Sequence, residues 1–566
     1  MERTVQNSAD EQHPGSVSVS SSTKKGGWVT FPFMIATITG ISLAFGGLVS
    51  NLIVYLIQEF NIKSIRAAKI YNVFNGFATI LPVAFAIIAD SFLGCYSVIW
   101  FSSLISSLGL LLIVLTAAFN KLRPPHCETG SNLCSDPSHV QLAVLYIGLA
   151  LAALGMAGTR FTVGPMGAYQ LDKPKHQTIF FNWYIFAMYI STAISSTVIL
   201  YVEESVSWAW GFGICLAANI FGLAIFLAGS GLYRRLKPEG SPFVVLARVI
   251  VAAIKKRHMK LSLKPEDYCQ GPDAADSKED KDIIPSKFFR FLNRAALKAE
   301  GDIKADYSIR PWRLCKVQDV EDLKGLIKIL PLWSTGFFLS TPLVMQTSLT
   351  VLQALVMDRH FGSTKVSIPA GSIWVSSLIS TCITVFLLDR FLYPLWDKYT
   401  RRPIKPLQRV GIGHVIDIIS MAALALVEAK RLKIVRQHHL QDQDNAIVPM
   451  SAFWLVVPFA IAGIGEAFFF PAQVAFYFQE FPTSLKSTST AFVALYMGIA
   501  YYISNGVIDL VRRTTGWLPD DINKGRLDNV YWLVCILASI NFCYFLVCAS
   551  LYKYRDPEKD TDDISD

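Results

Sequence analysis

Residues 96–118 read YSVIWFSSLISSLGLLLIVLTAA, a stretch without a single charged side chain. About 20 consecutive apolar residues are enough to carry an α-helix across the hydrocarbon core of a bilayer. Stretches of similar character recur along the chain, at 31–57, 70–89, 140–165, 180–202, 207–233, 325–352, 369–393, 407–429, 450–470, 488–511 and 530–552. The sequence therefore predicts an all-α membrane protein with about twelve transmembrane helices.

The composition excludes a soluble protein of this length. Hydrophobic residues make up 52% of the chain and charged residues 17%, whereas soluble domains have about 25% charged residues. We find no phosphate-binding Gly-rich loop, no metal-ligating His cluster and no nucleophile elbow. We therefore expect no enzymatic activity, no cofactor and no metal site. The net charge of +9 is spread over loops rather than gathered on one face, which argues against a nucleic-acid partner.

A long polar stretch divides the apolar segments into two groups of six. This division predicts five regions, which are a disordered cytosolic N-terminus at 1–30, an N-terminal six-helix bundle at 31–233, a cytosolic linker at 234–323, a C-terminal six-helix bundle at 324–553 and an acidic tail at 554–566. With both termini in the cytosol, the loops on that side hold more Lys and Arg than those outside. This bias favours that orientation of a multi-pass chain.

Two segments of the linker are apolar and basic at once. They are FVVLARVIVAAIKKRH (243–258) and SKFFRFLNRAALKAE (286–300). Such a composition suits amphipathic helices on the inner membrane surface, but it also suits a solvated connection between two bundles. Both interpretations stay open. A second open question concerns Cys127 and Cys134, which share the loop after the third span and form either a disulfide or two free thiols.

Several motifs resemble a known family in the order in which they occur along the chain. They are GGWVTFPF (26–33), ADSFLG (89–94), LRPPHC (122–127), FFNW (180–183), GIGEAF (463–468) and LPDDINKGRLDNVYWL (518–533). Together they resemble the plant nitrate transporter 1/peptide transporter family, part of the proton-dependent oligopeptide transporter group. The segments STPLVMQTSLTVLQALVMDR (340–359) and VGIGHVIDIISMA (410–422) are most similar to its nitrate excretion subgroup.

This resemblance implies a major facilitator fold, in which two six-helix bundles rock around a site near the bilayer midplane. It also implies a plasma-membrane transporter whose partners are a small anion, nitrate or chloride, and the lipid bilayer. The chain would work as a monomer or a weak homodimer.

The first helix departs from the family pattern. Coupled members have a Glu-x-x-Glu-Arg/Lys motif there, and the aligned positions in this chain are Ile38, Ile41 and Ser42. Proton coupling needs a group that gains and loses a proton near the pathway, and isoleucine has none. We expect passive, gradient-driven nitrate efflux, with chloride as a further substrate. The alternative is a proton-coupled symporter of nitrate, peptide or an organic anion, and a receptor without transport activity is a third reading.

Arg160, in GMAGTRF (155–161), stands where the family has a Lys or Arg. The resemblance implies a gating ion pair with Glu466 in the other half and a role for Arg160 in binding the anion. The forked guanidinium suits a planar oxyanion because it donates to two oxygens at once. The competing reading is that Arg160 extends to the headgroups.

Other polar residues within the spans are weaker candidates. From polarity alone, Tyr71, Gln346 and Thr347 are predicted to help bind the anion, while Leu343 occupies the place of a His that binds nitrate in some members. These polar residues are as easily explained by contacts between helices.

Three further residues are candidates for proton transfer or gating. His414 and Asp417 are three residues apart on one helix and form either a local structural pair or a substitute proton relay. Asp90, in the turn DSFLGCY, corresponds to a cytosolic latch of major facilitator carriers. The base that usually follows is here Cys95, which predicts a weaker latch.

Overall fold

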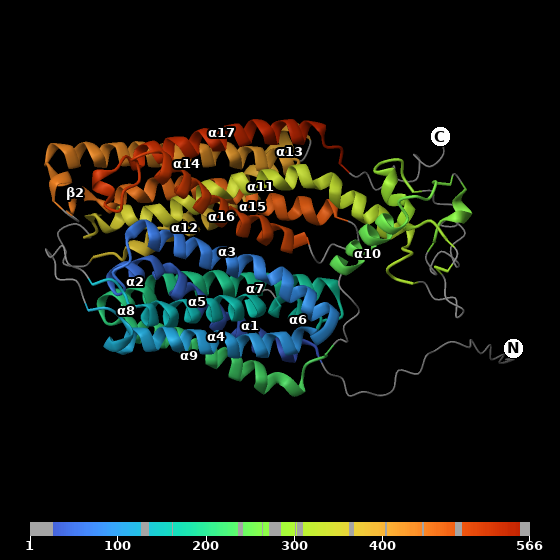
Figure 1. Ribbon diagram of the computed structural model, residues 1–566, viewed down its shortest axis with the longest axis horizontal. Coiled ribbons are helices and arrows are strands. Elements are labelled where there is room, and N and C mark those ends of the chain that lie inside the picture. Colours follow the sequence, from blue (N-terminus) through green and yellow to red (C-terminus); the bar gives the residue numbers. More distant parts are fainter. Residues whose placement is uncertain are drawn as a thin grey trace, which may run out of the picture.

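The computed structural model describes residues 26–125, 135–160, 162–235, 242–262, 264–270, 285–299, 301–302, 310–360, 367–401, 404–443, 446–481 and 489–554. Within them, 12 helices are long and apolar enough to cross a membrane. The predicted all-α membrane fold is therefore confirmed. The helices form two bundles that lie side by side, the first drawn in blue to green and the second in yellow to red (Figure 1).

The N-terminal bundle contains the first six spans. Its helices are α1 (Phe31–Ser50), α2 (Leu52–Gln58), α3 (Ser64–Ile88), α4 (Gly94–Ala118), α5 (His139–Arg160), α6 (Val163–Ala168), α7 (Pro174–Ile194), α8 (Leu200–Ser205) and α9 (Trp208–Ala228). Two π-helical turns, η2 (Ala89–Leu93) and η4 (Ser195–Ile199), connect α3 to α4 and α7 to α8.

The C-terminal bundle contains the other six spans. Its helices are α11 (Val317–Leu355), α12 (Val375–Leu387), α13 (Tyr393–Thr400), α14 (Pro406–Gln437), α15 (Val456–Glu480), α16 (Ser489–Thr514) and α17 (Leu527–Leu551). The π-helical turn η10 (Leu388–Leu392) connects α12 to α13. A short parallel pair of strands, β1 (Met357–Asp358) and β2 (Val448–Ser451), joins two loops. The seventh span starts at Val317, inside the segment that we expected to be linker.

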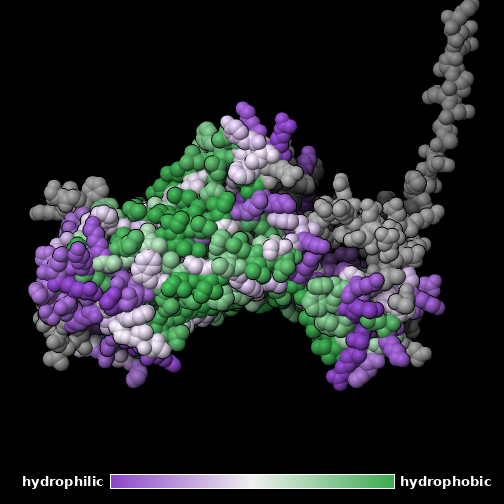
Figure 2. Space-filling view, turned by 90° about the horizontal axis from the view of Figure 1, so that it is seen from above, coloured by the Kyte–Doolittle hydropathy of each residue, from purple (hydrophilic) through white to green (hydrophobic). Residues whose placement is uncertain are grey.

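Small and polar residues hold the spans of each bundle together. Gly155 of α5 approaches α4 so closely that a Cβ atom would lie 2.2 Å from the backbone nitrogen of Ser106. Buried Asn219 of α9 donates to the hydroxyls of Ser106 and Ser107, at 2.9 Å each. Such contacts are typical of spans in lipid, where an apolar surface gains little by leaving the bilayer. Figure 2 shows the complementary feature, a broad hydrophobic surface between hydrophilic ends.

The two ends of the molecule differ. We call "terminal end" the end where Gly26 hydrogen-bonds to Leu232 and the Tyr554 hydroxyl lies 3.4 Å from the backbone nitrogen of Leu407. It also bears the linker helix α10 (Pro242–Lys255). The opposite end, which we call "distal", bears α2, α8 and β2 (Figure 1).

Polar contacts join the two bundles at the distal end. Several pairs of described residues cross the boundary there, and four of them show the kinds of contact. These four are Lys69 with Asp509 (2.5 Å), Lys63 with Asp520 (3.1 Å), Arg359 with Glu204 (3.1 Å) and the side-chain amides of Asn72 and Asn505 (2.9 Å). Gly371, in the turn before α12, faces Ser50 at the end of α1, and a Cβ atom on it would lie 2.1 Å from the Ser50 carbonyl oxygen.

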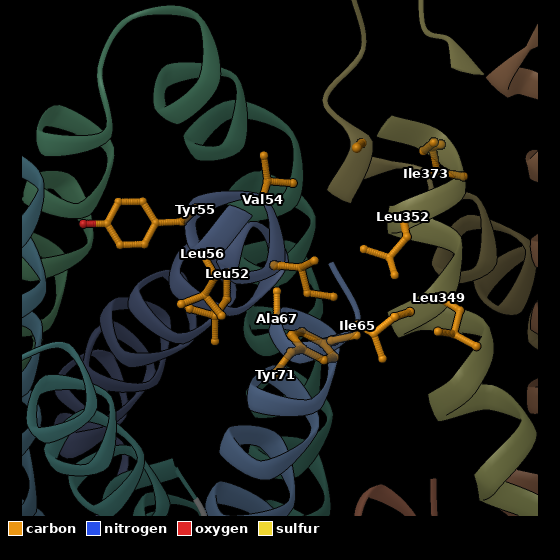
Figure 3. Close-up of a cluster of buried hydrophobic side chains, with 14 of the residues drawn as sticks. Leu52, Val54, Tyr55, Leu56, Ile65, Ala67, Tyr71, Leu349, Leu352 and Ile373 are labelled. Carbon is orange, nitrogen blue, oxygen red and sulfur yellow. The ribbon is translucent and has the colours of Figure 1, made fainter. Parts of the chain in front are cut away.

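An apolar seal accompanies these polar contacts. Ile65 of α3 points toward Leu349 and Leu352 of α11, and Ile373 closes the same region (Figure 3). All four side chains are buried. The seal belongs to one hydrophobic cluster that includes residues of both bundles.

At the terminal end the clusters do not cross the boundary between the bundles. Among the described residues, one cluster there contains only residues of the N-terminal bundle, such as Met34 and Phe226. The other contains only residues of the linker and the C-terminal bundle, such as Val249 and Phe476. The two bundles are therefore sealed together at the distal end and pack separately at the terminal end.

The contact at Gly371 leads to a first prediction. Replacing Gly371 with alanine puts a methyl group against the backbone of Ser50, which cannot be relieved by rotating a side chain. We expect the two bundles to separate at the distal end and the protein to lose about 1–3 kcal/mol of stability, the usual cost of overpacking.

The separation can be measured with spin labels at two exposed distal positions, Val140 at the start of α5 and Ile447 in the loop before β2. Their distance distribution should shift to longer values in the Gly371→Ala variant. The matched control is Gly506→Ala, because a Cβ atom on Gly506 would meet nothing within 4 Å. An unchanged distribution in Gly371→Ala would contradict the close contact.

Candidate functional site

A cavity of about 270 Å³ lies between the two bundles, directly under the distal seal. Its walls come from both halves, and most of the lining is apolar. The polar and charged residues that line it are Ser50, Tyr71, Asn75, Arg160, Thr192, Ser340, Thr347, Thr350, Glu466 and Tyr501. Pockets for organic ligands usually measure about 300–1,000 Å³. The size of this cavity therefore suits a small solute.

Arg160 brings the positive charge to the cavity. It is the last residue of α5, and its guanidinium carbon lies 4.7 Å from the centre of the Phe45 ring. Its Nη2 atom lies 3.6 Å from the Met188 sulfur, and the Tyr184 hydroxyl donates to its backbone oxygen at 2.5 Å. These contacts hold the guanidinium inside the bundle, where Arg160 lines the central cavity.

Glu466 brings a negative charge from the other bundle. It lies in the first half of α15, in the GIGEAF motif, and lines the same cavity. The hydroxyl of Thr381 donates to Glu466 Oε2 at 3.3 Å and also contacts the Gly463 carbonyl at 3.0 Å. The carboxylate is thus held by α12 in this conformation.

Arg160 and Glu466 share the cavity without touching. The ion pairs among the described residues do not include one between these two side chains, so the predicted gating pair is not closed in this conformation. Tyr501 of α16 and Tyr189 of α7 both lie within electrostatic range of the two charges. The cavity thus contains one positive and one negative side chain, contributed by different bundles, and phenol groups lie near both.

Of the three neutral candidates, two line the cavity. Tyr71 and Thr347 do so, whereas Gln346 does not. Gln346 is buried against α14, where Ser420 donates to its side-chain oxygen at 3.4 Å. The hydroxyl of Thr347 donates to the Leu343 carbonyl of its own helix at 2.9 Å. Leu343 also lines the cavity, so the place expected for a histidine faces the site but offers no hydrogen bond.

The positions of the missing coupling motif lie near the middle of α1, outside the cavity lining. Ile38 and Ile41 are buried in the cluster of the N-terminal bundle. Ser42 is buried as well, and its hydroxyl has no hydrogen-bond partner among the described residues. Hydrocarbon therefore fills the part of α1 where the family motif has its charges.

His414 and Asp417 are both buried in α14 but do not bond to each other. The His414 ring stacks on Phe545, with ring centres 4.8 Å apart. Neither Asp417 oxygen has a hydrogen-bond partner among the described residues. Asp417 packs against α15, where a Cβ atom on Gly465 would lie 3.5 Å from its backbone nitrogen. The predicted local pair is thus two separate buried groups, with Asp417 next to the turn that holds Glu466.

Three candidates cannot be placed. Cys127 and Cys134 lie outside the described residues. Asp90 belongs to η2, but its side chain lies outside the described part of the chain.

The sequence analysis missed several polar residues of the site. Asn75 follows Tyr71 by one helical turn and donates to the Tyr71 backbone at 2.9 Å. Tyr501, in the stretch YYISN (501–505), faces both charges. A tyrosine followed by an asparagine four residues later, on the same face of each helix, was the available signal at 71–75 and 501–505.

Comparisons with known proteins agree with this geometry. A family model described as PTR2, POT family, matches residues 96–523. The chain is 50% identical over 547 residues to the protein NRT1/PTR family 2.7 of Arabidopsis thaliana, with 96% of each chain covered. It is 51% identical over 540 residues to NRT1/PTR family 2.6 of the same plant, with 95% of each covered.

Solved structures show the same fold. One described as an auto-inhibited POT family peptide transporter has a TM-score of 0.67 at 16% sequence identity, and the match covers 94% of this chain and 98% of that one. The arrangement of two six-helix bundles around a central site is therefore of the major facilitator type. The chain belongs to the POT family, among the NRT1/PTR proteins, and is a multi-pass membrane transporter rather than an enzyme.

Proposed function

We propose that this transporter is a plasma-membrane carrier for small inorganic anions, which lets nitrate, and also chloride, leave the cell passively by alternating access. The observation that carries the proposal is the position of Arg160 in a small cavity between the bundles, combined with the hydrocarbon that fills α1 at Ile38 and Ile41. The first supplies a candidate anion site, and the second removes the two carboxylates of the family's coupling motif. The printed names of the relatives, which include NRT1, support nitrate as the substrate.

Arg160 is suited to the anion for two reasons. Its fork of N–H donors matches the geometry of two oxygens of a planar oxyanion. At a separation of about 4 Å and an effective dielectric constant near 20, the attraction between two unit charges is about 4 kcal/mol. An anion in the cavity can therefore compete with Glu466 for the guanidinium.

The sealed distal end defines the state described here. With the bundles joined by Lys69–Asp509 and Arg359–Glu204, an anion reaches Arg160 from the terminal end, which we assign to the cytosol. In the opposite state of the transport cycle, the cavity would open at the distal end. To reach that state, the contacts between the bundles at the distal end must break, and the two bundles must come together at the terminal end. Approach of Glu466 to Arg160 after the anion leaves would favour that closure, because it compensates the buried charge.

A test of coupling separates passive transport from symport. Purified protein is reconstituted into vesicles loaded with nitrate, and a pH gradient and a membrane potential are imposed one at a time. We expect nitrate flux to follow its own gradient and the potential. Accumulation of nitrate against its gradient, driven by the pH gradient at zero potential, would contradict passive transport. Vesicles without protein serve as the blank, and nitrate, chloride and a dipeptide are compared in parallel.

A test of the site uses Arg160→Gln. Loss of a charged hydrogen-bond partner costs about 1.5–3 kcal/mol, so we expect the nitrate flux to fall about 10- to 100-fold. Arg160→Lys should retain part of the flux, because the charge stays while the fork is lost. The matched control is Arg436→Gln, which removes an exposed arginine at the distal end of α14. Size-exclusion profiles and melting temperatures show whether each variant is folded. Wild-type flux in Arg160→Gln would remove Arg160 from the site.

A further inference from the structure

The linker at the terminal end forms a folded lobe that the transport site does not use. The lobe contains α10, the 3₁₀ turns η6 (Pro265–Asp267) and η8 (Arg290–Ala295), and the start of α11. One face of α10 is buried in its core, with Leu246, Val249 and Ala252 packed among residues of η8 and α11. Among the residues that the structure describes, this core contains none of the N-terminal bundle.

Three contacts fix the orientation of α10 within the lobe. Lys256, directly after the helix, forms a buried ion pair with Asp302 at 2.5 Å and donates to the Leu297 carbonyl at 2.5 Å. Lys255 donates to the Trp312 carbonyl at 3.3 Å. The helix therefore cannot roll to bury its remaining surface without breaking a buried ion pair, which is costly.

That remaining surface is also apolar. Ala247, Ile250, Val251 and Ile254 follow the i, i+3, i+4, i+7 spacing of one helical face. Ile250 is 45% exposed and Ile254 59%. A helix in water presents polar residues on its outer side, so this second apolar stripe needs another occupant.

Basic and aromatic residues border the stripe, and acidic residues are absent from it. The segment 242–262 contains Arg248, Lys255, Arg257 and Lys260 but no Asp or Glu. Trp312, 44% exposed, lies with its ring 5.8 Å from the Arg248 guanidinium carbon. This combination of aliphatic, tryptophan and basic side chains is the one found at the surface of anionic bilayers.

The position of the lobe brings the stripe to the height of the headgroups. The 39 residues of α11 extend over about 58 Å, whereas the hydrocarbon core is about 30 Å thick, so the first turns of α11 stand outside the core. Figure 2 shows the lobe overhanging one lateral face of the bundles. Its hydrophobic surface (green) faces the notch beside the apolar belt, and hydrophilic side chains (purple) lie on its far side.

We propose that α10 lies in the interface of the membrane that holds the bundles, with Ile250 and Ile254 between the lipid headgroups and with Lys255 and Arg257 on anionic lipids. The occupant of the apolar stripe is thus the transporter's own bilayer. Because the hydrophobic core of the lobe, within the described part of the chain, continues into the C-terminal bundle and not into the N-terminal one, this contact would tie the C-terminal bundle to the membrane surface and leave the N-terminal bundle free to rock.

Hydrogen exchange of the full-length protein tests the proposal. The protein is placed in nanodiscs of phosphatidylcholine alone or with about one-third phosphatidylglycerol, because each basic residue near an anionic surface favours contact about fivefold. We expect amides of residues 247–258 to exchange about tenfold more slowly in the anionic discs than in detergent, with an intermediate rate in the neutral discs. Equal exchange in all three would overturn the proposal, and the stripe would then have to be covered by another protein.

Two pairs of variants separate the apolar contribution from the basic one. Ile250→Asp with Ile254→Asp should abolish the protection in both kinds of disc, while Ile447→Asp, an exposed isoleucine of a distal loop, should leave it unchanged. Lys255→Gln with Arg257→Gln should remove only the difference between anionic and neutral discs, and Arg436→Gln is its control. Unchanged exchange across the lobe core in detergent shows that each variant is folded. Full protection in the Ile250→Asp, Ile254→Asp variant would overturn the proposal.

Discussion

A guanidinium inside a bilayer is stable only where polar groups, an opposite charge or water compensate it, and Arg160 imposes this condition on the centre of the molecule. Phe45 and Met188 contact its guanidinium and Tyr184 holds its backbone, so the charge stays in place. Glu466, the opposite charge, belongs to the other bundle. In our proposal, a bound anion or an approach of the two halves compensates the charge of Arg160, and this would link occupancy of the site to conformation.

The distal seal is built differently from the site. Ion pairs that are partly exposed contribute little each, so Lys63–Asp520 and Lys69–Asp509 mainly set the register of the two bundles. The side chains of Ile65, Leu349 and Leu352 and the close backbone contact at Gly371 exclude solutes from the distal side of the cavity. The two bundles are thus packed together on the distal side of the cavity, whereas the described residues of each bundle form a separate hydrophobic cluster at the terminal end. The structure thus combines a closed distal side with a central cavity, which we propose as the anion site.

Hydropathy predicted the spans because each transmembrane helix pairs its backbone groups within itself and exposes apolar side chains to lipid. Both conditions can be recognised from the sequence of one segment. The family resemblance pointed to Arg160 and Glu466, and both line the central cavity, but the roles that it implies for them stay predictions. Hydropathy could not place Gln346, which is one residue from Thr347 and points toward Ser420 instead of the cavity. A polar side chain within a span can hydrogen-bond to a neighbouring helix as well as line a binding site. The rotation of the helix about its axis decides which of the two it does. His414 and Asp417 fail as a pair for the same reason, because spacing brings side chains near but neighbouring helices choose their partners.

The length of α11 has a mechanical consequence. Val320 lies in the core of the lobe, and Leu343 lines the cavity, so one continuous helix connects them over about 35 Å. Pro331 interrupts its hydrogen bonds between these two points and provides a place where it can bend. The outer part of this helix packs in the lobe, and its inner part forms part of the cavity wall. If α10 rests on the membrane surface as we propose, a shift of the lobe there would be transmitted along α11 to the cavity wall that Arg160 also lines.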